Sequence, residues 1–383
     1  MGRFVNKPVI TAVIPTFKRV RLLERAIESV LLQTYQNLKI CIYDNSPDDE
    51  TKRVVERYLN KDARVLYKKN PRNIGAINNI VQGVKLVDTE YYSLLSDDDF
   101  LLPNFYERVI QAFEKYPDAG FVCAKTITID LNSKSVRYQN ENWQHGYYRP
   151  SKEIVSRMFY SHFTQTGVVL RKDMRQLIGS FDPAGDDKQY MTLASASCPF
   201  VVIDGFGAVY MIHKDSFSAL LNYARVDVSS LHKSMLASVK IISQLKIEDD
   251  TKAILLRLFV SNFEYKFEAK KAAMYVEGKL DPENDLVSSR VTFAGLLCKL
   301  YEHFSDGVAT AFTKMLKGFR RAIADKSKSS VQRSVALPSD LFDLFSQETT
   351  DVKKILSRLD TAPRNRKTGD GQQSILPVQD VHS

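Results

Sequence analysis

Three consecutive carboxylates, Asp97, Asp98 and Asp99, follow an apolar run in the segment YYSLLSDDDFLLP (91–103). Like charges this close repel one another and raise each other's pKa. A bound cation would remove that conflict, and hard divalent cations prefer oxygen ligands of this kind. The triplet is therefore a candidate cation site. A solvated acidic turn after a buried strand is the alternative.

Short apolar segments alternate with amphipathic ones before the triplet. VITAVIP (9–15) is rich in β-branched residues and is stopped by a proline, which is typical of a strand. The apolar residues of the next segment, 19–33, recur at helical spacing. The other predicted strands are 38–43, 64–69 and 91–95, and the other predicted helices are 50–59 and 76–87. This alternation predicts an α/β fold with a mostly parallel sheet and helices on both faces.

Polar loops follow three of the predicted strands. PTFKR follows the first strand, YDNSPDD follows the second, and the acidic triplet follows the last. In parallel sheets wound with helices, ligands bind beyond the carboxyl ends of the strands. We therefore expect the three loops to meet at one edge of the sheet and to form an active site there.

The same texture continues to about residue 222 and then changes. A helix is predicted over 103–116 and a strand over 120–125, and the pair Asp186 and Asp187 opens a further apparent helix. Beyond residue 222 the segments are long and amphipathic, with little sign of strands. We predict an α/β domain over 1–222, a mainly helical C-terminal domain over 223–361, which includes helices at 231–247 and 251–276, and a disordered tail over 362–383.

The chain has 383 residues, 44% of them hydrophobic, and this length suits two domains. Its net charge of +9 would suit a nucleic acid, an anionic membrane surface or phosphorylated substrates. No motif that reads DNA or RNA is present, so nucleic acid is not expected as a partner. The four cysteines are far apart with no CxxC pair, which predicts reduced thiols. The opening apolar run is too short for a signal peptide, which predicts a cytoplasmic protein.

An ordered set of motifs points to one family. VIPTFKR, YDNSPDDET, NIGAINN, LLSDDDFLLPNF, GSFDPAGDDKQYMTLA and YMIHKDS follow one another along the chain. Together they resemble the family 2 glycosyltransferases with a GT-A fold, over about residues 8–217. The resemblance implies inverting transfer of a sugar from a nucleotide-diphosphate sugar, with a UDP-sugar preferred, and it implies Mg²⁺ or Mn²⁺ as cofactor. The implied acceptor is a saccharide or a lipid-linked molecule in the synthesis of surface polysaccharide or lipopolysaccharide.

The same resemblance implies which residues bind the metal. The family's Asp-X-Asp motif overlays on LSDDDF with Ser96 at its first Asp and Asp98 at its last. Asp98, Asp99 and His213 are thereby implied as metal-site residues, and Asp97 is implied in orienting the metal, the ribose or the acceptor. The departure at Ser96 leaves open which carboxylate meets the ribose. For His213, a purely structural histidine is the alternative.

Further residues are implied in binding the nucleotide-sugar. Asp44 would contact its base or ribose, although YDNSPDD also has the composition of a surface turn. Asn73 would lie in the segment beneath the nucleotide, or it caps the helix that follows. The remaining implied residues are Pro15, Thr16 and Phe17 in the first loop, Arg72 and Gly75 beside Asn73, and Lys214 near the leaving diphosphate.

An inverting transfer also needs a general base that takes the proton from the acceptor hydroxyl. The overlay on the family puts Asp187 at that position and Asp186 at the glutamate that precedes it. Carboxylates at the start of a helix are also favoured by the helix dipole. A capped helix without catalytic function is therefore the alternative.

Two other functions and one surface remain open. A nucleotidyltransferase normally carries a glycine-rich loop after its first strand, and VIPTFKRVR contains no glycine. A degenerate fold that only binds ligands is the non-enzymatic alternative. Segment 307–333 has the pattern of a basic amphipathic helix. It would lie on an anionic membrane, pack on its own domain or contact a second copy of the chain.

Overall fold

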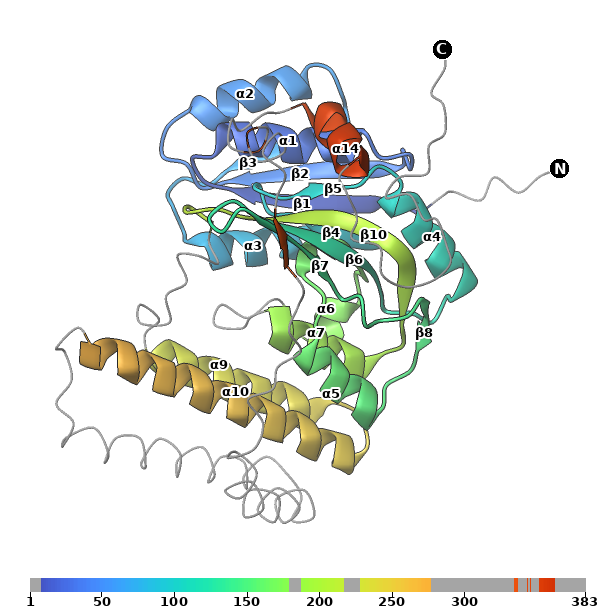
Figure 1. Cartoon of the computed structure of the whole chain (residues 1–383), viewed down its shortest axis with the longest axis vertical. Helices are drawn as coiled ribbons and strands as arrows, with labels where there is room; N and C mark the ends of the chain where they lie inside the picture. The colour runs from blue at the N-terminus through green and yellow to red at the C-terminus, as the bar shows by residue number, and fades with distance from the viewer. Residues whose placement is uncertain are drawn as a thin grey trace.

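The computed structural model describes residues 8–178, 187–216, 228–276, 334–336, 343, 345 and 351–361. The strands in this part of the chain form one 11-stranded sheet with the path β11-β7-β6-β9-β4-β1-β2-β3, and β10 joins it by pairing with β5, β6 and β8. Helices cover both faces of the sheet (Figure 1). The predicted α/β class is thus confirmed.

The first four strands are parallel, and they alternate with helices along the chain as predicted. In register, Thr16 of β1 lies opposite Asp44 of β2, and Val13 of β1 lies opposite Leu94 of β4. The strands are β1 (Ile10–Thr16), β2 (Leu38–Asp44), β3 (Val65–Lys69) and β4 (Tyr91–Leu94), and the helices between them are α1 (Val20–Leu31), α2 (Glu50–Leu59) and α3 (Ala76–Lys85). The carboxyl ends of β1, β2 and β4 therefore meet at one edge, as predicted.

The second half of the sheet is mixed. β10 runs parallel to β6, whereas β9 is antiparallel to both β4 and β6. The strands are β5 (Phe100–Leu101), β6 (Phe121–Asp130), β7 (Ser135–Gln139), β8 (Gly146–Tyr148), β9 (Val168–Arg171) and β10 (Phe200–Ile212). The helices are α4 (Phe105–Lys115), α5 (Lys152–Tyr160), the 3-10 turn η1 (Gln165–Gly167), α6 (Met174–Ile178) and α7 (Asp187–Ser197).

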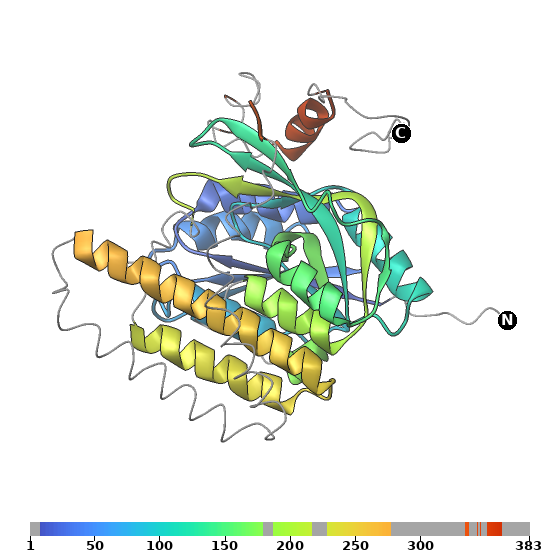
Figure 2. The same cartoon turned by 60° about the horizontal axis from the view of Figure 1, so that its bottom comes forward.

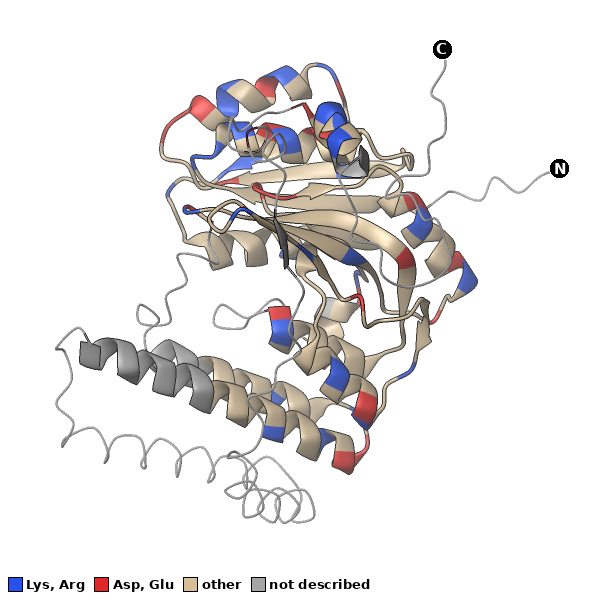
Figure 3. Ribbon diagram, viewed as in Figure 1, with Lys and Arg blue, Asp and Glu red and all other residues tan. Residues whose placement is uncertain are grey.

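Alternating strand residues supply a separate core on each face of the sheet. Ile10, Ala12 and Ile14 of β1 pack with α1, α2 and α4, whereas Val13 faces the opposite core, which contains residues of α3, α5 and α7. This is the period of two that an extended strand imposes on its side chains. Figure 3 shows that Lys, Arg, Asp and Glu lie mainly on the outer helices, with fewer on the strands.

Two long helices, α9 (Val228–Gln244) and α10 (Asp249–Val276), confirm the helical segments predicted after residue 222. They lie side by side (Figure 2), and α10 contacts α5 and α7. Leu255 and Phe259 of α10 belong to the same core as Phe200 of the sheet. The helical layer is therefore packed directly on the α/β part.

The chain then returns to the sheet, which was not predicted. The short strand β11 (Ser334–Ala336) pairs antiparallel with β7, and α14 (Val352–Thr361) contacts α1. Ile355 is buried in a core with Phe100 and Val209. The predicted domain boundary near 222, the segment 307–333 and the tail 362–383 lie outside the described residues.

Cys123 and Cys198 are buried free thiols and Cys41 is a half-buried one, in agreement with the predicted reduced state, while Cys298 lies outside the described residues. Burial raises the pKa of Cys198 to about 12 and that of Cys41 to about 11. Among the helices that the structure describes, none combines the length and the apolar character that crossing a membrane requires.

Candidate active site

A cavity of about 260 Å³ opens at the predicted edge of the sheet. The loops after β1, β2 and β4 and the start of α3 surround it. Seven of the predicted site residues line it, namely Pro15, Thr16, Phe17, Asn73, Gly75, Asp97 and Asp98. The other lining residues are Arg19, Asn45, Ala76, Asn79, Ile80 and Ser96. The structure thus brings together residues from four separate motifs.

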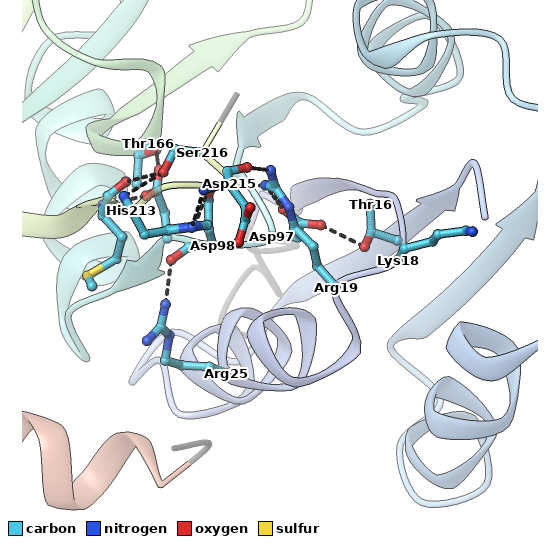
Figure 4. A network of polar contacts seen from close by, with 12 residues as sticks. Thr16, Lys18, Arg19, Arg25, Asp97, Asp98, Thr166, His213, Asp215 and Ser216 are labelled. Atoms are coloured by element: carbon cyan, nitrogen blue, oxygen red, sulfur yellow. Dashed lines mark hydrogen bonds and ion pairs between the residues drawn. The ribbon is translucent and has the colours of Figure 1, made fainter. Parts of the chain in front are cut away.

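The carboxylates of Asp97 and Asp98 share one cationic partner, Arg19 (Figure 4). Arg19 Nη1 lies 3.2 Å from Asp97 Oδ1 and 3.1 Å from Asp98 Oδ2, and Thr16 Oγ1 donates to Asp97 Oδ2 at 2.7 Å. Burial and the neighbouring charge of Asp98 raise the pKa of Asp97 to about 6, while Arg19 opposes that rise. The pair is thus an anionic site that needs positive charge.

His213 reaches the same place from the turn after β10. Its Nε2 lies 3.2 Å from Asp98 Oδ2, and the backbone N–H of Asp215 donates to its Nδ1 at 3.3 Å. Because Nδ1 accepts a hydrogen bond, a neutral ring would carry its proton on Nε2 and donate it to Asp98. The pairing of β10 with β5 brings this turn to the acidic triplet.

Asp99 points away from the cavity into the protein. It is fully buried, its Oδ1 accepts from Met211 N at 2.8 Å, and its Oδ2 accepts from the Thr166 hydroxyl. Burial, together with the charge of Asp98, raises the pKa of Asp99 well above its usual range. Arg25 Nη2 also donates to the backbone carbonyl of Asp98 at 2.6 Å. The triplet is therefore fixed from several sides.

The donor atoms of the triplet are of the kind that a hard divalent cation prefers, although Arg19 lies against them here. Nη1 of Arg19 marks a position about equally far from oxygens of Asp97 and Asp98, and these are the donor atoms that Mg²⁺ and Mn²⁺ prefer. Within the described residues, no group of three His, Cys, Asp or Glu side chains is arranged to hold a metal. With Arg19 in place, the arrangement suits a guanidinium.

Asn45, Asn73 and Asn79 form another part of the cavity wall. Asn70 Nδ2 donates to Oδ1 of both Asn45 and Asn79, at 2.8 Å each, and Asn45 Nδ2 donates to the Gly75 carbonyl at 3.1 Å. Asp44, predicted to contact the nucleotide, is fully buried and is not among the residues lining the cavity.

The Asp44 carboxylate instead accepts from Ser46 N and Tyr67 Oη, both at 2.7 Å. These contacts hold the loop after β2, and the next residue, Asn45, lines the cavity. The predicted contact between Asp44 and the nucleotide stays a prediction.

The segment before α3 contributes Asn73 and Gly75. Gly75 has φ +85°, a value that favours glycine, and its N–H donates to Asn73 Oδ1 at 2.8 Å. Because Gly75 is the N-cap of α3, Asn73 holds the turn before the helix and does not cap it. Arg72 lines a neighbouring groove of about 800 Å³ together with Lys68 and Lys85.

Asp187, the predicted base, is the first residue of α7 and is half-buried. Its Oδ2 accepts from the backbone N–H of Gln165 at 3.3 Å. The next residue, Thr166, contacts Asp99, so η1 links the start of α7 to the acidic triplet. Asp186 lies outside the described residues, and Lys214 is exposed beside His213.

Residues 11–176 match the family described as Glycosyl transferase family 2. The chain contains a family 2 glycosyltransferase domain. An uncharacterized glycosyltransferase of Methanocaldococcus jannaschii is 26% identical to it over 163 residues, which are 42% of this chain and 54% of that protein. The GalNAc(5)-diNAcBac-PP-undecaprenol beta-1,3-glucosyltransferase of Campylobacter jejuni is 33% identical over 105 residues, 27% of this chain and 34% of that protein. The chain therefore spans about half or less of these curated relatives.

Solved structures show the fold of this domain. Staphylococcus aureus TarS 1–349, crystallised with UDP-GlcNAc, superposes with a TM-score of 0.60 at 13% identity, over 82% of this chain and 92% of that one. Its likeness shows that the fold is GT-A-like. The family and the fold implied by the motifs are thus confirmed.

Sequence reasoning missed three polar residues that line the cavity, Arg19, Asn45 and Asn79. Each lies within or beside a motif that had been singled out, in PTFKR, YDNSPDD and NIGAINN. A positive charge next to a predicted loop, in a protein with an acidic triplet at the same sheet edge, is the signal that would have found Arg19.

Proposed function

We propose that the chain is an inverting glycosyltransferase that moves a sugar from a UDP-sugar to a hydroxyl of a saccharide or lipid-linked acceptor. The observation that carries the proposal is the cavity at the ends of β1, β2 and β4, where Asp97 and Asp98 meet beside Arg19 and His213. It occurs in a family 2 glycosyltransferase domain, at the edge of the sheet where such folds bind ligands.

The cavity suits a nucleotide with a diphosphate. Phe17 is 42% exposed on its wall and offers an aromatic face to a base, while Asn45 and Asn79, whose amide groups are hydrogen-bonded inside the protein, hold the wall in place. UDP is proposed over other nucleotides because TarS, which has the same fold, was crystallised with UDP-GlcNAc. The base would lie against Phe17 while the diphosphate faces Asp97 and Asp98.

Asp98 is the proposed principal metal ligand, with Asp97 and His213 beside it. Mg²⁺ or Mn²⁺ held there would supply positive charge to the departing diphosphate. Asp99 was also assigned to the metal, but both of its carboxylate oxygens accept hydrogen bonds inside the protein. We therefore propose that Asp99 fixes the backbone of the triplet. Lys214, exposed on the adjacent turn, is proposed to add charge near the diphosphate.

Asp187 is the proposed general base. Its carboxylate would accept the proton of the acceptor hydroxyl as that oxygen attacks the anomeric carbon from the face opposite the diphosphate. One displacement of this kind inverts the anomeric configuration. The link through Gln165 and Thr166 to Asp99 keeps the start of α7 close to the acidic triplet in the fold.

The acceptor is proposed to belong to surface polysaccharide or lipopolysaccharide synthesis in the cytoplasm. A relative from Campylobacter jejuni is named for a polyprenyl-diphosphate-linked acceptor, which favours a lipid-linked one here. Contact of segment 307–333 with an anionic membrane, or with a second copy of the chain, stays a prediction.

Thermal unfolding in a panel of UDP- and GDP-sugars, with and without Mn²⁺, tests the proposal. A ligand present at 100 times its Kd adds about 2.7 kcal/mol to the free energy of unfolding, so one UDP-sugar with Mn²⁺ should raise the melting temperature clearly. The stabilising sugar is then offered with acceptor saccharides, and the anomeric configuration of the product is determined. Absence of stabilisation by every nucleotide sugar, or a product with retained configuration, would contradict the proposal.

A further inference from the structure

Arg19 lies at the centre of the candidate active site. Its Nη1 contacts both Asp97 and Asp98, and its Nη2 donates to the backbone carbonyl of Asp215 (Figure 4). Its side chain is 22% exposed, whereas those of Asp97 and Asp98 are 6% and 9% exposed. Arg19 therefore reaches from the cavity wall to two nearly buried carboxylates.

Two neighbouring carboxylates at this depth need a counter-charge, because an unpaired buried charge is costly. In this arrangement Arg19 supplies it, with His213 as a further neighbour of Asp98. A divalent cation on the same oxygens would meet the positive guanidinium at contact distance, and the two like charges would repel each other. Arg19 and the metal thus compete for one position.

Arg19 has another anion within the same cavity once a nucleotide is bound. It lines the cavity beside Phe17 and Asp97, and a guanidinium pairs with phosphate oxygens through two parallel hydrogen bonds. Its partial exposure leaves room for a change of rotamer. Movement from the carboxylates to a diphosphate would exchange one anionic partner for another.

We propose that Arg19 is an exchangeable counter-ion of the Asp97–Asp98 pair. Without substrate it occupies the metal position, and when the metal and the nucleotide bind together it transfers to the diphosphate. This inference rests on the proposed function. It makes the metal and the nucleotide bind cooperatively, because each alone leaves either Arg19 or the carboxylates without a suitable partner.

The test is calorimetric titration of the full chain with Mn²⁺ in the absence of nucleotide. Arg19→Gln removes the competing cation and should bind Mn²⁺ about tenfold or more tightly than the wild type. Arg21→Gln is the matched control, because Arg21 is exposed on α1 and its loss removes the same charge without touching the carboxylates. It should bind Mn²⁺ as the wild type does.

A second titration, with UDP at saturating Mn²⁺, should show the opposite change. Arg19→Gln should bind UDP about tenfold more weakly, because the diphosphate has lost its guanidinium partner. A folded Arg19→Gln protein with unchanged or weaker Mn²⁺ affinity would overturn the inference, and so would unchanged UDP affinity.

If Arg19→Gln does not fold, Arg19→Lys carries the test. A lysine ammonium cannot span both carboxylates and the Asp215 carbonyl as the guanidinium fork does. Mn²⁺ should then bind several-fold more tightly, and an unchanged affinity would overturn the inference. A wild type that binds UDP with Mn²⁺ but shows no effect of Arg19 rejects only the inference. Failure of wild type and variants alike to bind Mn²⁺, with or without UDP, rejects both the inference and the proposed metal site.

Discussion

The acidic triplet and the start of α7 both carry carboxylates proposed to act on the substrates, yet the chain supports them differently. The triplet receives hydrogen bonds from the last residue of β1, from α1, from η1 and from β10. All three of its aspartates are buried. Asp187 is half-buried, begins its helix, and meets η1 through the backbone N–H of Gln165.

We expect this difference in support to separate ligand binding, at the triplet, from proton transfer, at Asp187. A change in the triplet alters a buried, interlocked loop, so it should affect ligand affinity and stability together. A change at Asp187 alters the first residue of a helix, so it should leave the fold and the nucleotide site intact. The predictions below test this separation, beginning with the largest expected effect.

Asp187→Asn should lower sugar transfer by about 100-fold or more, the usual contribution of a general base, because an amide cannot accept the proton. Metal-dependent affinity for the nucleotide should stay at the wild-type value. Initial rates and calorimetry on the same preparation measure both.

Asp186→Asn, assayed beside it, is the control for a misalignment of one residue. Near-wild-type transfer by Asp187→Asn would move the base elsewhere, with Asp186 first to be considered. Loss of nucleotide binding by Asp187→Asn would contradict the proposed separation of nucleotide binding from proton transfer.

Arg25→Met should weaken both stability and binding, although Arg25 lies beneath the triplet and not in the cavity. The change leaves the buried carbonyl of Asp98 without this hydrogen bond and removes the guanidinium from its place 5.2 Å from the Phe100 ring centroid. We expect the free energy of unfolding to fall by about 1–3 kcal/mol. Denaturant unfolding measures it.

Arg25→Met should also lower the affinity for UDP in the presence of Mn²⁺ by about tenfold, a difference of about 1.4 kcal/mol. Arg53→Met, on the exposed side of α2, is the control and should change neither quantity. If Arg25→Met lost stability but kept full affinity, the triplet would not depend on its support.

Phe17→Ala should have the smallest effect. Stacking of an aromatic ring contributes about 0.5–1.5 kcal/mol beyond area burial, so UDP affinity should fall roughly 2–12-fold with little change in melting temperature. Leu177→Ala, which removes a similarly exposed apolar side chain on α6, should change neither. Unaltered UDP binding by Phe17→Ala would mean that the base lies elsewhere in the cavity.

The parallel half of the sheet could be predicted from the sequence because local patterns encode it. Each of β1 to β4 is a short apolar run next to an amphipathic helix, and the polar loops follow at the strand ends. β11 could not be predicted in this way, since a strand of three residues gains its structure from pairing with β7, almost two hundred residues earlier in the chain.

The site was predictable to the level of loops but not of individual side chains. Asp98 and Asp99 are neighbours, yet one faces the cavity and the other the interior. Likewise, Asp44 is buried whereas Asn45 lines the cavity. Which of two successive residues faces a ligand depends on the twist of the loop. The contact of Arg19 with the triplet depends on the pairing of β1 with β4, which composition does not encode.

The central claim is that Asp98 and its neighbours hold a divalent cation through which the nucleotide binds. Calorimetric titration with UDP, with and without Mn²⁺, on wild type, Asp98→Asn and the exposed control Asp118→Asn tests it most directly. Wild type and Asp118→Asn should bind UDP about tenfold or more tightly in Mn²⁺, a difference of about 1.4 kcal/mol. Asp98→Asn should bind it equally weakly in both conditions. Equal, Mn²⁺-dependent affinities in wild type and Asp98→Asn would contradict the claim.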